Sequence, residues 1–157
     1  MDSLFHFVIS LAGGFVFLVL TKTKYDPLHL FALSFLSLFI DVQHLFEAFY
    51  IYPVFHAIYF ALIPSAAVLF FFSRKQMQLA VYSSALSLML FGHLFSDMIQ
   101  GFYGVPLFYP FSAHLFMLPW ALMTFKGAPV IGAAGLAMAL YFGLIYVSAK
   151  MVSALKP

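Results

Sequence analysis

The sequence predicts an all-α integral membrane protein of about five transmembrane helices, forming a single domain over residues 1–157. Two features of the composition predict this class: 65% of the residues are hydrophobic and only 8% are charged, whereas about a quarter of the residues in a soluble domain are charged. The mean hydropathy of +1.06 agrees with this class. A second soluble domain, a nucleic-acid-binding protein and a secreted disulfide scaffold are excluded, because apolar runs use nearly the whole chain and cysteine is absent.

Five apolar runs separated by short polar breaks are the predicted helices. Asp2 precedes the first run, and the first basic residue is Lys22. We therefore interpret this run as a mature helix, since a cleavable signal opens with basic residues. The connection over residues 100–127 contains three prolines, and its apolar stretch Ala113–Phe125 is too short to span, which indicates an interfacial or re-entrant segment. The five runs are Leu4–Leu20, Leu28–Phe46, Phe55–Ser73, Met77–Ile99 and Ala128–Ala149.

Lysines and arginines set the predicted orientation, because cytoplasmic loops carry an excess of them. With the loop after the first helix inside, five helices run N-out and C-in, and only Lys126 of the seven basic residues lies outside. The predicted location is the inner, or cell, membrane of a prokaryote. The six cytoplasmic basic residues are Lys22, Lys24, Arg74, Lys75, Lys150 and Lys156.

Histidines and aspartates inside the apolar runs gather at the outer ends of the first four predicted helices. They are His6, Asp41, His44, His56, His93 and Asp97. Asp41 and His44 are spaced i,i+3, and His93 and Asp97 are spaced i,i+4, so each pair shares one helix face. An aspartate within a spanning helix costs about 2.5–3.5 kcal/mol on insertion scales. We therefore expect both faces to point into the bundle, together with Ser34 and Ser37.

Imidazole and carboxylate groups without sulfur are a ligand set suited to zinc, manganese or iron. We predict a divalent metal, zinc first, bound by the six residues just named, with Asp41 or Asp97 acting as general base where it does not ligate the metal. Two other interpretations stay open. The Asp–His pairs can instead fix helix packing, or they can relay protons or cations. His114 is expected at the surface, and His29 on the inner side.

The last part of this pattern resembles a known family. His93-Leu-Phe-Ser-Asp97, followed by Gly104-Val-Pro-Leu-Phe-Tyr-Pro-Phe-Ser112, looks like the signature of the YdjM-like inner-membrane proteins of bacteria and archaea. His6, Asp41-Val-Gln-His44 and Val54-Phe-His56 precede that block in the family's order, with Ile51 and Tyr52 where the family pattern has histidine and arginine. The resemblance implies a membrane-bound metal-dependent hydrolase.

The favoured function is therefore hydrolysis of an ester or phosphoester in a lipid or lipid-linked substrate, through metal-activated water. The alternatives are a transporter of protons or divalent cations, and a non-catalytic membrane assembly protein. Expected partners are membrane lipids and a small-molecule or lipid substrate, without nucleic acid. A second copy of the chain is a further expected partner, through small residues on the fifth helix. These are Ala128, Gly132, Gly135, Ala139 and Gly143.

Overall fold

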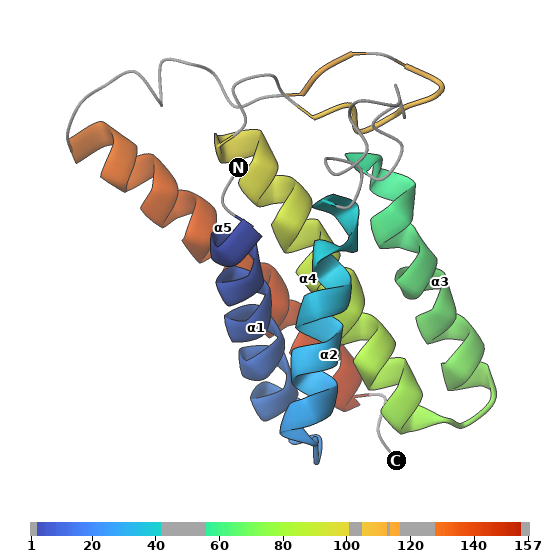
Figure 1. Cartoon of the computed structure of the whole chain (residues 1–157). Helices are drawn as coiled ribbons and strands as arrows, with labels where there is room; N and C mark the ends of the chain where they lie inside the picture. The colour runs from blue at the N-terminus through green and yellow to red at the C-terminus, as the bar shows by residue number, and fades with distance from the viewer. Residues whose placement is uncertain (1–2, 42–55, 101–104, 113, 117–127, 155–157) are drawn as a thin grey trace.

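The protein is a bundle of five helices that run alternately up and down (Figure 1). The structure is a computed structural model, and it describes residues 3–41, 56–100, 105–112, 114–116 and 128–154. Because the direction alternates, the start of α1, the end of α2, the start of α3 and the end of α4 share one end of the bundle. The helices are α1 (Ser3–Leu20), α2 (Pro27–Ser37), α3 (Ile58–Ser73), α4 (Met77–Gln100) and α5 (Ala128–Ala154).

The helix bounds follow the predicted apolar runs closely, except in α2. There the α-helix stops at Ser37 and continues as a 3₁₀ turn over residues 38–41. The hydroxyls of Ser34 and Ser37 donate back to the carbonyls of Leu30 and Ser34 within the same helix, a type of bond that bends helices. The remainder of the predicted run to Phe46 lies outside the described residues.

By length and hydropathy, one helix within the described residues is long and apolar enough to cross a membrane. It is the part of α4 from Met77 to Met98, 22 residues with a mean hydropathy of 1.5, or about 33 Å of helix. The core helix of a soluble protein passes the same test, so the five-span topology stays a prediction. Four other apolar helical stretches are shorter: His6–Leu20, Pro27–Asp41, Ile58–Ser73 and Gly143–Ala154.

The main core lies where α4 packs against α1, α2 and α5. Gly13 and Gly14 of α1 allow this close approach. A Cβ atom on Gly13 would overlap the hydroxyl of Tyr141 from α5, and one on Gly14 would overlap the end of Met89 from α4. The fully buried side chains of this core are Phe17, Leu18, Met89 and Ile145.

Large apolar side chains also cover the outside of the bundle. Each helix carries some of them, and α4 carries the fewest. A water-exposed monomer rarely shows so extensive an apolar surface. The most exposed examples on the helices are Leu28, Phe35, Ile63, Leu69, Leu140 and Met151.

The connection between α4 and α5 folds back over one end of the bundle (Figure 1). Val105 and Phe116 form an isolated antiparallel bridge, with N–O distances of 2.7 and 2.9 Å. The carbonyl of Leu107 accepts a 2.8 Å hydrogen bond from the amide of Ile58, which ties this connection to the start of α3. Most of the segment predicted to be interfacial or re-entrant lies outside the described residues, and residues 114–116 are not helical.

Candidate metal centre

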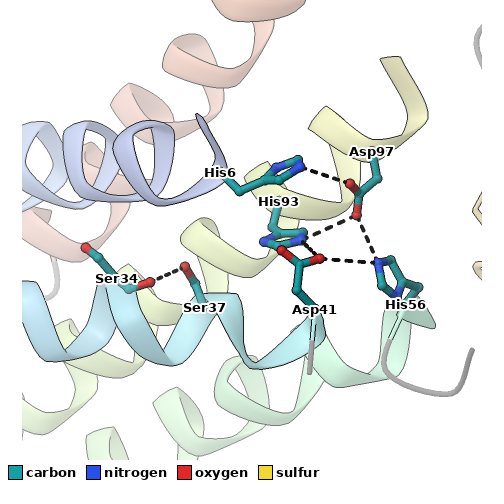
Figure 2. Close-up of polar contacts among 7 residues, drawn as sticks. All are labelled: His6, Ser34, Ser37, Asp41, His56, His93 and Asp97. Carbon is teal, nitrogen blue, oxygen red and sulfur yellow. Dashed lines mark hydrogen bonds and ion pairs between the residues drawn. The ribbon is translucent and has the colours of Figure 1, made fainter. Parts of the chain in front are cut away.

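Five of the six predicted ligands converge at one end of the bundle (Figure 2). They come from four separate elements, and their imidazole and carboxylate groups point toward one another. The sixth predicted ligand, His44, lies outside the described residues. The five are His6 of α1, Asp41 at the end of the 3₁₀ turn after α2, His56 two residues before α3, and His93 and Asp97 of α4.

Asp97 is the centre of this cluster. Its Oδ1 lies 3.3 Å from Nε2 of His6. Its Oδ2 lies 3.2 Å from Nε2 of His56 and 3.4 Å from Nε2 of His93. Yet neither oxygen makes a hydrogen bond of acceptable geometry with any described residue. Three imidazole nitrogens therefore lie within ion-pair distance of a buried carboxylate.

Asp41 lies on the other side of the cluster. Its Oδ1 is hydrogen-bonded to Nε2 of His93 at 3.2 Å and lies 3.9 Å from Nε2 of His56. Its side chain is 11% exposed, against 2% for Asp97 and 7% for His56. Asp41 is thus the more exposed of the two carboxylates.

These separations match those between neighbouring ligands of one small ion. In a tetrahedral zinc site with bonds of about 2.0–2.1 Å, adjacent ligand atoms lie about 3.3 Å apart. Four of the five nitrogen–oxygen separations in the cluster fall between 3.2 and 3.4 Å. Two triplets hold their ligand atoms within 4.8 Å of one another, one formed by His6, His93 and Asp97 and the other by Asp41, His56 and His93. Either triplet could hold a metal ion.

The charge of the cluster also fits a divalent cation. Two carboxylates and three neutral imidazoles carry a charge of about −2, and burying it without compensation is costly. Every lysine and arginine that the structure describes lies toward the opposite end of the bundle (Figure 1). A bound cation, or protons on the imidazole or carboxylate groups, would compensate this charge.

Each side chain reaches the cluster for a local reason. The i,i+4 spacing places His93 and Asp97 on one face of α4. The ring of His6 stacks on that of His93, with 4.3 Å between centroids and 17° between planes. The amide of Ile58, two residues after His56, donates to the carbonyl of Leu107 and so ties the start of α3 to the α4–α5 connection.

Two serines beside the cluster were not predicted from the sequence. Ser10 lies one turn along α1 from His6, and Ser96 immediately precedes Asp97. Both hydroxyls are buried and make no hydrogen bond with any described residue. Their spacing could have identified them: Ser10 is i+4 from His6, and Ser96 is i+3 from His93. Each serine therefore lies on the same helix face as its histidine.

The remaining histidines of the described chain stand apart from this centre, as the sequence predicts. His114 is exposed, and its ring meets that of Phe116 edge-on at 4.8 Å. His29 is exposed near the start of α2, at the opposite end of the bundle, 5.7 Å from the ring of Tyr82.

Comparisons with known proteins give no match to a family model, to a curated protein or to a solved structure. The resemblance to the YdjM-like proteins therefore stays a prediction, and the role of the chain is argued from its own residues.

Proposed function

We propose that the chain is an integral membrane protein that holds one divalent metal ion, zinc first, and hydrolyses an ester or phosphoester of a lipid or lipid-linked substrate. The observation that carries this proposal is the buried carboxylate of Asp97, with three imidazole nitrogens at 3.2–3.4 Å and no hydrogen bond to any described residue.

The distribution of side chains supports the membrane part of the proposal. Several serines, histidines and aspartates of the helices are buried, while leucine and phenylalanine side chains cover much of the outside. The exposed polar side chains His29, Ser73 and Ser153 lie toward the end of the bundle opposite the cluster. This is the arrangement expected where hydrocarbon surrounds the bundle. The basic residues that the structure describes collect at the end opposite the cluster, which agrees with the metal centre lying at the outer side of the membrane.

The donor set supports the metal part. Nε2 of all three histidines faces the carboxylates, and histidine nitrogen with carboxylate oxygen is a ligand combination that zinc accepts. Asp97, in contact with three imidazoles, is the natural carboxylate ligand. A bound zinc ion with an open position would supply Lewis-acid chemistry, polarising the substrate oxygen and lowering the pKa of a water molecule to about 7.

Asp41 is the residue that we assign as general base. Its side chain is 11% exposed, against 2% for Asp97, and the hydrogen bond between its Oδ1 and His93 keeps the carboxylate oriented. A carboxylate in this place can accept a proton from the attacking water and return it to the leaving group. The exposed apolar faces beside the site agree with a substrate that enters from the lipid phase.

The polar residues of α2 give less support to the transport alternative. A conduction path needs polar groups along the length of the bundle, yet in the described residues of α2 the buried polar stripe below Asp41 ends at Ser34. The hydroxyls of Ser34 and Ser37 are both engaged by carbonyls of their own helix. Below them lies the apolar core around Leu30 and Phe17.

The test is a hydrolysis assay on the zinc-loaded protein in detergent, with p-nitrophenyl palmitate and bis(p-nitrophenyl) phosphate as the ester and phosphoester probes. We expect turnover of one probe, with an Asp41→Asn variant losing about 10²–10⁴-fold in rate while keeping its metal. His114→Ala removes an exposed histidine outside the cluster and is the matched control. Full activity in metal-loaded Asp41→Asn would contradict the assigned role, and a metal-loaded parent without turnover of any ester or phosphoester would contradict hydrolysis.

A further inference from the structure

The end of the bundle opposite the metal centre contains two neighbouring cavities lined by lysines. The larger, of about 470 Å³, lies between the carboxyl ends of α1 and α5. The smaller, of about 230 Å³, lies between the loop after α1 and the start of α4. Lys22 lines both of them, Lys150 lines the larger and Lys24 the smaller. No acidic side chain is among the residues that line either cavity.

The backbone places Lys22 between the cavities by a specific helix ending. Its amide donates to the carbonyl of Val19, and the amide of Thr23 donates to that of Leu18, the bonding pattern of a Schellman motif. Lys22 accordingly has a φ of 50°, at a position where glycine is usual. These bonds occupy the carbonyls of Leu18 and Val19 near the end of α1.

The larger cavity is lined by both polar and apolar side chains. The ammonium group of Lys150 lies 5.6 Å from the centre of the Tyr146 ring, so both side chains share one face of α5. Thr21 and Ser153 add hydroxyls to the lining. Leu20 and Tyr146 add apolar surface to the lining, and their side chains are 39% and 51% exposed.

We propose that the larger cavity binds the phosphodiester headgroup of an anionic phospholipid, with its acyl chains against the exposed apolar side chains of Leu20 and Tyr146. A volume of about 470 Å³ lies within the range of small-molecule sites. Basic pockets on the cytoplasmic side of helix bundles are suited to anionic lipid headgroups. A free phosphate ion would use the lysines but leave the apolar lining unused, and for this reason the lipid is the favoured source of the anion. This site is independent of the metal centre.

The test uses the full-length protein in mild detergent, titrated with dioleoyl phosphatidylglycerol or dioleoyl phosphatidylcholine and followed by native mass spectrometry. We expect preferential retention of the phosphatidylglycerol. Its affinity should fall about fivefold in each of Lys22→Gln and Lys150→Gln, the effect of one lysine at an anionic membrane surface. Lys150→Arg, which keeps the charge, should bind like the parent.

Lys75 offers a closely matched control. It ends α3 with the same pattern of backbone bonds and has a φ of 59°, but it lines neither cavity. Lys75→Gln should change the affinity less than twofold. Equal binding of the two lipids, or equal losses in Lys75→Gln and Lys22→Gln, would overturn the proposal. Saturable binding of inorganic phosphate that displaces the lipid would overturn the assignment to a lipid. Melting temperatures close to that of the parent show that the variants are folded.

Discussion

The two aspartates of the metal centre should respond very differently to the same substitution. Asp97 contacts three imidazole nitrogens at 3.2–3.4 Å, whereas Asp41 contacts two, one of them only at 3.9 Å. If Asp97 is a ligand and Asp41 a general base outside the coordination shell, then Asp97→Asn removes a metal bond. Asp41→Asn removes only a neighbouring interaction. Asparagine keeps the shape of both side chains, so packing changes little.

The expected magnitudes follow from the energetics of zinc sites. Four ligands together bind structural zinc with about 10–16 kcal/mol, or about 2.5–4 kcal/mol per ligand. Loss of Asp97 as a ligand should therefore weaken zinc binding by about 10²–10³-fold. Loss of a group that only orients a ligand, as Asp41 orients His93, costs about 10–100-fold. Asp97→Asn should thus be the weaker zinc binder by roughly tenfold.

The assay is a competition titration of zinc against a chromophoric chelator, with each variant in the same detergent and buffer. His29→Ala, which removes an exposed imidazole at the opposite end of the bundle, should bind zinc like the parent. Equal affinities for Asp97→Asn and Asp41→Asn, or a larger loss for Asp41→Asn, would refute the division of roles between the two carboxylates.

Two further predictions concern the packing that holds the site together. Gly13→Ala should destabilise the bundle by about 1–3 kcal/mol, because the added methyl overlaps the ring of Tyr141. Gly143→Ala meets open space and should raise stability through helix propensity. Thermal unfolding in detergent compares the two variants, and equal shifts in melting temperature would argue against the close approach of α1 and α5. Ser87→Ala removes a 3.0 Å hydrogen bond from α4 to the carbonyl of Ala61 in α3 and a second bond between the hydroxyls of Ser87 and Ser65. It should cost about 1.2 kcal/mol, from an average of about 0.6 kcal/mol for each such bond between membrane helices. A loss above about 3.5 kcal/mol in the same unfolding measurement would contradict two ordinary hydrogen bonds.

Much of the fold could be predicted because hydropathy alone separates the helices. Runs of leucine, phenylalanine and alanine end at short polar breaks, and α3 and α4 begin and end within a few residues of the predicted bounds. The early end of the α-helical part of α2 at Ser37 could not be predicted. It depends on where serine hydroxyls bond back to their own helix, and hydropathy does not register such local bonds.

The convergence of the site residues also followed from the sequence. When helices alternate in direction, a polar residue at the start of one helix and another at the end of the next helix must lie at the same end of the bundle. The partners across helices were not predictable. Spacing pairs His93 with Asp97 within α4, but the structure also places His6 and His56 against Asp97, and Asp41 against His93. Those contacts depend on the rotation and depth of each helix, which periodicity does not fix.

The divalent metal content of the purified full-length protein tests the central claim most directly. We expect about one equivalent of zinc, or of manganese or iron, per chain by elemental mass spectrometry, retained in His114→Ala and lost in His93→Ala. A parent protein that is folded and holds no divalent metal, even after incubation with each of these ions, would contradict a metal centre. It would leave protonated histidines as the compensation for the buried Asp41 and Asp97 carboxylates.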